Sequence, residues 1–293
     1  MNGIIIIDKP SAWTSHDVVA KLRGALKVKR VGHGGTLDPM ATGVLPIFTG
    51  RATRAAEFCE NADKEYIAGL RLGIVTDTQD ITGAVIGACD AVITASELAD
   101  ILPRFLGAQN QIPPMYSAIK QNGKKLYELA RRGVDVTRAP RGIVVSEIEL
   151  IGTQDNDFTL RIACSKGTYV RTLCHDIGHA LGCGGTLSSL RRTKSGAFTI
   201  DMAHTLDSVL DAISAGGIDE LLIAVDAIFS DYPAITLSED DARKFRSGTP
   251  CDCCDLPAGK YRLFGPDNEF LLIGEADGSE ITVIKRFFDN SYH

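Results

Sequence analysis

Residues 32–46, GHGGTLDPMATGVLP, place a glycine-rich segment and a single carboxylate directly before an apolar run. Glycine permits positive φ and lets another chain segment or a ligand approach closely. Pro39 restricts Asp38 to extended backbone angles and removes the next amide donor. We therefore expect a rigid loop that presents Asp38, as nucleophilic or general-base chemistry requires. The same residues also suit a plain connection with a turn at Asp38.

The segments around this loop predict a mixture of strands and helices. Runs of β-branched residues, or alternating apolar residues, predict strands at 3–8, 44–48, 64–72, 143–151, 157–164 and 187–199. Helical apolar spacing and capping residues predict helices at 16–26, from about 53, and at 96–105, 172–181 and 205–229. In the third strand, Tyr66, Ala68 and Leu70 would share one face because side chains alternate.

Two changes in composition predict the domain organisation. After Pro233 the chain becomes β-rich, with one short helix at 239–246 and strands near 259–264, 270–276 and 281–287. We therefore predict a main domain at 1–232 and a small C-terminal domain at 233–293. Residues 107–142 are rich in Gln, Pro, Lys and Arg with little apolar periodicity, which predicts an insertion that projects from the main domain and clasps a partner.

The charge distribution indicates a polyanionic partner. The whole chain has a net charge of −6. Residues 1–200 contain 24 Lys and Arg against 19 Asp and Glu, a net charge of +5, and residues 201–293 contain 7 against 18, a net charge of −11. Basic residues gather at 21–30, 120–141 and 191–194. Each cluster alone suits a solvated surface, but three in one segment favour nucleic-acid binding.

Several classes of protein are excluded by what the sequence lacks. No apolar run approaches the length of a membrane span, and no export signal precedes the eight cysteines, so we expect reduced thiols in the cytosol. Neither residues 32–35 nor 166–168 complete a nucleotide-binding motif, so we expect no nucleotide cofactor. Cys251, Cys253 and Cys254 could form half a zinc site, but no second pair has suitable spacing, so we expect no metal.

Arg171 is unusual because it lies in the first turn of a predicted helix, where the helix dipole disfavours a cation. We therefore expect a buried anionic partner, and Asp38 is the candidate. Such a pair would keep Asp38 ionised. Tyr66 and Tyr169 lie near strand ends, where an aromatic side chain serves either as packing or as the platform for a flipped base.

Taken together, these motifs resemble the TruB family of tRNA pseudouridine synthases. The resemblance covers about residues 3–195 and rests on motifs in the family's order: IIIDKP at 5–10, the loop at 32–46, KEYIAGLRLG at 64–73, TDTQD at 76–80, CSKGTYVRTLCHDIG at 164–178 and LRR at 190–192. It implies an α/β fold of the α+β type, with a central mixed, mainly antiparallel sheet flanked by helices. Residues 233–293 resemble the family's PUA-like RNA-binding domain.

The resemblance also implies roles for particular residues. Asp38 would be the catalytic carboxylate, Tyr66 would stack on the target uracil, and Arg171 would pair with Asp38. The remaining matched positions would contact the substrate or support its site: His33 on the RNA, Tyr169 and Leu190 around the uracil, Lys9 beneath the loop, and Asp80 as the last acid of TDTQD.

The implied reaction is isomerisation of uridine to pseudouridine at position 55 in the T-loop of tRNAs, without a cofactor, by a cytoplasmic and monomeric enzyme. Asp38 would act either as nucleophile or as the base at C2′, and the sequence does not separate these. A non-catalytic RNA-folding module is the main alternative, although binding alone does not need the carboxylate. A glycosidase is a third reading, although it normally needs two carboxylates that flank the bond.

Overall fold

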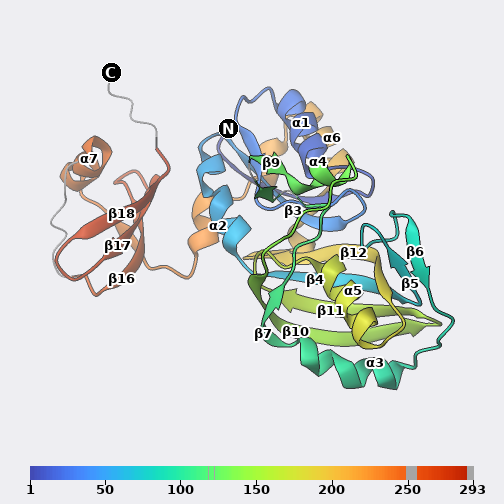
Figure 1. The fold of residues 1–293 in the computed structure, drawn as a ribbon. Coiled ribbons are helices and arrows are strands. Elements are labelled where there is room, and N and C mark those ends of the chain that lie inside the picture. Colours follow the sequence, from blue (N-terminus) through green and yellow to red (C-terminus); the bar gives the residue numbers. More distant parts are fainter. Residues whose placement is uncertain (118, 122, 249–255, 289–293) are drawn as a thin grey trace.

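The computed structural model describes residues 1–117, 119–121, 123–248 and 256–288 (Figure 1). Over these residues the largest element is a ten-stranded sheet with neighbours in the order β14-β1-β3-β12-β4-β11-β10-β7, where β2 also pairs with β3 and β13 with β12. Its strands are β1 (Gly3–Lys9), β2 (Val31–His33), β3 (Thr42–Thr49), β4 (Lys64–Leu72), β7 (Gly107–Gln111), β10 (Arg141–Gln154), β11 (Asp157–Cys164), β12 (Gly185–Ser195), β13 (Phe198–Thr199) and β14 (His204–Thr205).

The predicted fold class is confirmed. Among the described strands of this sheet, the pairs β1–β14 and β3–β12 are parallel and the others are antiparallel. The helices are α1 (Ser15–Leu26), α2 (Ala56–Asn61), α3 (Ala95–Ile101), α4 (Leu126–Ala130), α5 (Val170–Ala180), α6 (Leu206–Ala215) and α7 (Glu239–Ser247), with short 3-10 turns η1 (Gly50–Ala55), η2 (Leu102–Phe105), η3 (Ile200–Met202), η4 (Ile218–Leu221) and η5 (Val225–Phe229).

Strand β1 shows why an apolar run without alternation forms a central strand. Ile5 and Ile7 pack into one core, and Ile4 and Ile6 pack into a second core on the opposite face. All four side chains are fully buried, and burying each contributes about 1.5–3 kcal/mol. The following helix α1 begins at the predicted place, because Thr14 and Asp17 form a reciprocal capping box.

Strand β4 has the predicted alternation, and this alternation places the site. Tyr66, Ala68 and Leu70 are buried in the first core, which also contains Leu173 and Ile177 of α5. Figure 1 shows α5 lying across the sheet at β4 and β11. One face of β4, including Tyr66, is therefore fixed by packing in the same core as α5.

The segment predicted to project from the main domain begins inside the sheet. Its first five residues form β7, the edge strand, which pairs with the start of β10. The rest contains the short pair β8 (Lys120–Gln121) and β9 (Lys124–Lys125), followed by α4. Figure 1 shows this part leaving β7 and running toward the end of the molecule that carries α1.

The helix predicted over residues 205–229 is shorter in the structure, so that prediction was wrong in its length. Helix α6 ends at Ala215, where Gly216 takes the left-handed conformation with φ of 77° and its amide donates to the carbonyls of Ala212 and Ile213. Glycine adopts this conformation without the strain that a Cβ causes, so it terminates helices. The chain continues through η4 and η5.

The C-terminal segment forms a second, smaller unit. A four-stranded sheet in the order β15-β16-β17-β18 packs with α7 around its own apolar core, which includes Phe245, Leu263 and Leu272. The strands are β15 (Ala234–Thr236), β16 (Gly259–Phe264), β17 (Phe270–Ala276) and β18 (Ile281–Arg286); the remaining described pair, β5 (Ile74–Thr76) with β6 (Val85–Ala88), belongs to the main unit. The predicted helix and three strands of the tail are thus present. The cysteines at 251, 253 and 254 lie outside the described residues.

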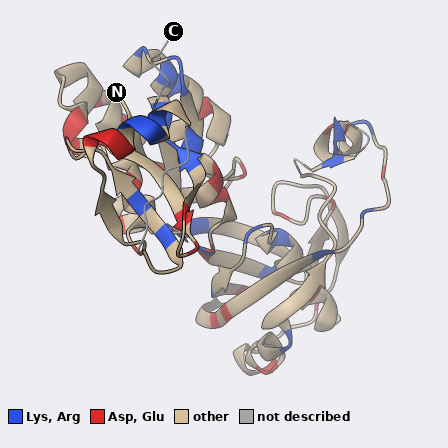
Figure 2. Cartoon of the chain, turned by 90° about the vertical axis from the view of Figure 1, so that its left-hand side faces the viewer, with Lys and Arg blue, Asp and Glu red and all other residues tan. Residues whose placement is uncertain are grey.

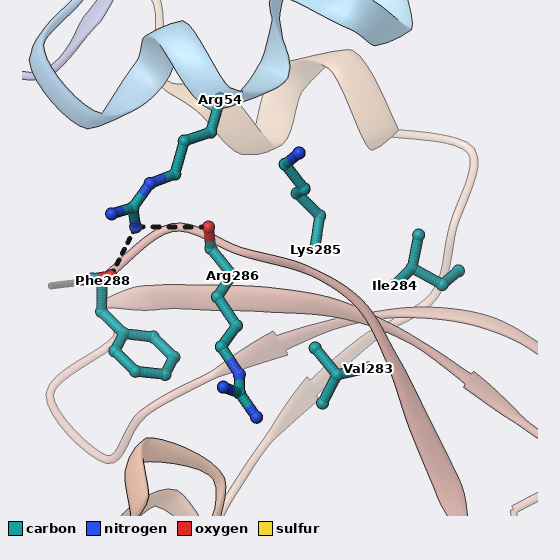
Figure 3. Close-up of a pocket in the computed structure, with 6 residues that line it drawn as sticks. All are labelled: Arg54, Val283, Ile284, Lys285, Arg286 and Phe288. Carbon is teal, nitrogen blue, oxygen red and sulfur yellow. Dashed lines mark hydrogen bonds between the residues drawn. The ribbon is translucent and has the colours of Figure 1, made fainter. Parts of the chain in front are cut away.

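The junction of the two units combines apolar packing with charged contacts around a cavity of about 620 Å³ (Figure 3). Arg54 of η1 donates to the carbonyl oxygens of Phe288, at 2.5 Å, and Arg286, at 3.5 Å. Lys285 of β18 pairs with Glu57 of α2. The side chain of Arg286 points away from Arg54 (Figure 3). Arg54 and Lys285 therefore join the two units.

The close approach of β3 and β12 allows no side chain at Gly43. An added Cβ would lie 2.2 Å from the carbonyl oxygen of Arg192, and Gly43 has a φ of 99°. We expect Gly43→Ala to lower the free energy of unfolding by about 2–4 kcal/mol in urea titrations.

Gly216→Ala is the matched control, because Gly216 also has positive φ but nothing lies within 4 Å of an added Cβ. Its loss should be about 1 kcal/mol, from backbone strain alone. Equal losses in the two variants would show that the contact with Arg192 carries no steric penalty.

Candidate active site

The loop that carries Asp38 is anchored at both ends. The Gly34 amide donates to the Pro46 carbonyl at 2.9 Å, and the Ala41 amide donates to the Asp38 carbonyl at 3.0 Å. The Ser15 hydroxyl, which is buried at the start of α1, accepts from the Leu37 amide and donates to the Leu37 carbonyl. These bonds hold the backbone on either side of Asp38, as the sequence predicted for a rigid loop.

Lys9 supports the same loop from below. Its ammonium donates to the carbonyls of Pro10, Trp13 and Pro39, and its exposed fraction is 0%. Burial lowers the pKa of Lys9 to about 8, although Asp38 acts in the opposite direction. Because no part of this side chain reaches the surface, the geometry suits support of the loop rather than direct contact with a substrate.

The predicted pair of Asp38 and Arg171 is present. Nη1 of Arg171 lies 3.2 Å from Oδ2 of Asp38 and 3.6 Å from Oδ2 of Asp80. The Arg171 and Asp80 side chains are 7% exposed, whereas the Asp38 side chain is 38% exposed. One buried guanidinium therefore joins two carboxylates, of which only Asp38 is open to a ligand.

Opposing influences set the pKa of Asp38. Burial raises the pKa of Asp38 above its usual value; Arg171 and Lys9 lower it, and Asp80 raises it further. Arg171 lowers the pKa of Asp38, as the predicted pair requires, while desolvation acts more strongly in the opposite direction. The ion pair limits this rise but does not reverse it.

Asp80 and the segment after β7 complete the surroundings of Arg171. One carboxylate oxygen of Asp80 accepts from the hydroxyls of Thr78 and Thr82, so its turn holds it in place. On the other side, Nη2 of Arg171 donates to the Tyr116 carbonyl at 2.6 Å. Arg171 therefore connects three parts of the chain: the loop that carries Asp38, the TDTQD turn at 76–80 and the segment at 107–142.

Three further predicted residues lie around this group. Tyr66 is 9% exposed on β4, and Leu190 of β12 pairs with Ala68 beside it. The guanidinium of Arg171 lies 5.7 Å from the centre of the Tyr169 ring. Gln111 of β7 holds the Tyr169 backbone through two hydrogen bonds, at 2.8 and 3.1 Å. Tyr169 therefore lies beside Arg171, and the pKa of Tyr66, which burial raises most, is raised further by the nearby Asp38.

His33 lies at the end of β2, at the entrance to the loop. Its ring meets that of His16 edge to face, with 5.3 Å between centroids, and its buried Nδ1 has no hydrogen-bond partner among the described residues. Burial lowers the pKa of His33 to about 4, and His16 and Arg192 act in the same direction. The imidazole is therefore neutral at pH 7, which leaves it available for uncharged contacts.

Comparison with known proteins identifies this arrangement. A model described as "TruB family pseudouridylate synthase (N terminal domain)" matches residues 23–170, and one described as "tRNA pseudouridylate synthase B C-terminal domain" matches residues 171–230. The chain belongs to the TruB family.

Relatives and solved structures of similar length agree with the TruB assignment. The chain is 43% identical to tRNA pseudouridine synthase B of Syntrophotalea carbinolica, over 91% of this chain and 89% of the relative. It is 42% identical to the protein of the same name from Aromatoleum aromaticum, over 98% and 92%. A solved Cbf5-Nop10-Gar1 complex matches with a TM-score of 0.75 and 26% identity, over 98% of this chain and 85% of that chain.

The sequence analysis missed the role of two buried cations in this TruB site. Arg192 was counted in a basic cluster and in the LRR motif, without a role of its own, yet its side chain is 1% exposed and bonds to carbonyls of residues 35 and 44, on either side of Asp38. Lys64, 8% exposed, donates to the carbonyls of Glu60 and Ala62, and burial lowers its pKa to about 8. Strand alternation could have predicted that both side chains point toward the site. Residue 64 shares a face with Tyr66, and residue 192 shares a face with Leu190.

The surface charges of the TruB chain are mixed. Figure 2 shows Lys and Arg on several elements of both units, interspersed with Asp and Glu. Among the described residues, no group of three or more His, Cys, Asp or Glu is arranged to hold a metal ion, and no helix is long and apolar enough to cross a membrane.

The lowered pKa of His33 predicts acid sensitivity. Between pH 6.5 and about 4 the unfolded chain binds a proton at this imidazole and the folded chain does not, so stability falls as the pH drops through this window. We expect a contribution on the order of 1–2 kcal/mol after allowance for solvent screening.

Urea unfolding at several pH values measures this effect. His33→Gln should lose less stability than the wild type between pH 6.5 and 4.5. His179→Gln, which changes an exposed histidine at the end of α5, is the control and should follow the wild type. Parallel curves for all three proteins would contradict the prediction.

Proposed function

We propose that this protein isomerises uridine to pseudouridine in tRNA, at position 55 of the T-loop. The observation that carries the proposal is the partly exposed carboxylate of Asp38, held by a buried guanidinium next to aromatic side chains. Membership of the TruB family and the relatives named tRNA pseudouridine synthase B support the same reaction and substrate.

The reaction breaks the N1–C1′ bond of uridine and forms a C5–C1′ bond with the same base. It transfers no electrons to an external acceptor, and the proton lost from C5 is balanced by one gained at N1. The base must leave its stack to be reached, as in other enzymes that modify bases. The protein therefore has to extrude the uridine, hold the detached uracil while it turns, and stabilise the reactive sugar or ring.

Asp38 is the group that meets the reacting atoms. As a nucleophile its carboxylate attacks the sugar or the uracil ring; as a base it removes the C2′ proton. Both routes require an ionised carboxylate, which the guanidinium of Arg171 favours at 3.2 Å. Both also benefit from a rigid loop, because chemistry is fast only when the reacting atoms are pre-positioned.

The surrounding residues take complementary roles. Tyr66 provides the platform on which the uracil stacks, and Tyr169 and Leu190 close the uracil pocket beside it. His33, neutral at pH 7, lies directly before the loop that carries Asp38. There it contacts the RNA and fills the space left by the extruded nucleotide. Lys9 and Asp80 act through Asp38 and Arg171, since both side chains are buried and bonded within the protein.

The rest of the molecule binds the RNA arm. The basic residues of 120–141 follow directly after the contact between Tyr116 and Arg171, and this contact supports our proposal that the segment at 107–142 clasps the T-arm next to the site. Lys and Arg contacts to phosphates make the affinity fall with added salt. We assign residues 233–293 to a PUA-like domain that adds RNA contacts, and we expect the enzyme to act as a monomer in the cytoplasm.

Mapping pseudouridine by carbodiimide modification and primer extension on an unmodified tRNA transcript tests the proposal. Wild-type protein should produce one new stop at the T-loop uridine, with the RNA mass unchanged. Asp38→Asn should lower the single-turnover rate by at least about 10³-fold, because amides neither attack nor accept the proton.

Asp157→Asn is the matched control, because Asp157 of β11 also pairs with an arginine, at 2.6 Å, but its partner Arg71 lies at the end of β4 remote from Tyr66. It should retain the wild-type rate. RNA binding without any new stop in the wild type would favour a non-catalytic folding module. Release of free uracil, with a matching loss of RNA mass, would indicate a glycosidase.

A further inference from the structure

Arg192 is a buried cation that forms no ion pair with a carboxylate of the described residues. Its side chain is 1% exposed and is among the largest fully buried side chains of the described residues. None of the ion pairs found among those residues involves it. Burying an unpaired charge is strongly unfavourable, so the groups that replace water around this guanidinium must be arranged for it.

Those groups belong to the catalytic loop. Nε of Arg192 donates to the Val44 carbonyl at 2.7 Å, and Nη2 donates to the Gly35 carbonyl at 3.1 Å. Nη1 approaches the Thr36 carbonyl at 3.5 Å. Gly35 and Thr36 precede Asp38 in the chain and Val44 follows it. One planar group therefore grips the loop on both sides of the catalytic carboxylate.

The same guanidinium reaches the predicted uracil platform. Arg192 of β12 and Tyr66 of β4 are direct partners across two antiparallel strands, so their side chains share one face of the sheet and lie next to each other. The position of the tyrosine ring is therefore tied to that of the guanidinium.

We propose that Arg192 is a positioning residue that sets the distance and orientation between Tyr66 and the loop carrying Asp38. This inference rests on the proposed function, because the distance matters only if the uracil stacks on Tyr66 while Asp38 reacts. The residue touches neither the substrate nor the reacting atoms. It acts by fixing two groups from different elements against each other, which β4 and the glycine-rich loop do not achieve alone.

Arginine is needed here for a geometric reason. Its planar fork bonds the carbonyls of Val44 and Gly35 at once, next to its cross-strand partner Tyr66. The ammonium of lysine is a compact point charge that cannot match this fork. Arg192→Lys keeps the charge but cannot bond the Val44 and Gly35 carbonyls at the same time. The loop and the tyrosine should therefore become free to move relative to each other.

Single-turnover kinetics at saturating tRNA test the proposal. We expect Arg192→Lys to lower the maximal rate at least tenfold while the Kd for tRNA changes less than threefold. Arg71→Lys is the matched control: it changes an arginine at the other end of the same sheet region, paired with Asp157, and should keep the wild-type rate. A wild-type maximal rate in Arg192→Lys would overturn the proposal.

A double-mutant cycle separates positioning from general support of the fold. If Arg192 acts partly through the tyrosine hydroxyl, the loss caused by Arg192→Lys should be at least threefold smaller in a Tyr66→Phe background. Losses that simply multiply would show that Arg192 does not act through Tyr66 and would overturn the link.

A measurement independent of activity distinguishes failure of this inference from failure of the proposed function. In protein labelled with [13C]tyrosine, the Cζ resonance of Tyr66, assigned by its absence from Tyr66→Phe, should shift in Arg192→Lys and not in Arg71→Lys. If Arg192→Lys does not fold, the guanidinium resonances of Arg192 can be compared between wild type and Tyr66→Phe. An unchanged environment in either comparison would overturn the contact.

Discussion

The site depends on one desolvated guanidinium shared between two carboxylates. Arg171 binds Asp38 and Asp80 with the same Nη1 and the Tyr116 carbonyl with Nη2. Three segments that are distant in sequence meet at this group. Removing one member of such a buried set leaves an uncompensated charge, so the catalytic loop, the TDTQD turn and the start of the projecting segment stabilise one another. Of the two carboxylates, Asp38 is the more open to solvent, and it is the one to which we assign the reaction.

A second constraint is that the loop is held mainly through its carbonyl oxygens. Lys9 and Arg192 are buried cations whose donors point at main-chain carbonyls rather than at acids. This arrangement fixes the backbone without placing another anion near Asp38, where it would raise the pKa of that carboxyl further. Rigidity of the loop and the protonation of its carboxylate are thereby adjusted by different residues.

Much of the fold was predictable because its signals are local. The apolar run of β1, the alternation of β4 and the capping box of α1 each act within a few residues, and each formed as expected. The pairing of Arg171 with Asp38 was also predictable, since a cation in the first turn of a helix needs an anion nearby. The predicted helix over 205–229 failed because the pair Gly216 and Gly217 ends it.

By itself, the sequence determined the order of the elements, the carboxylate on its glycine-rich loop and the family to which the chain belongs. Tertiary structure alone decided that Arg192 lies inside the molecule rather than on a basic surface, that Lys9 supports the loop, and that burial outweighs Arg171 in setting the pKa of Asp38. The physical reason is desolvation: composition shows which charges exist, but only the packing of distant strands decides which of them lose their water.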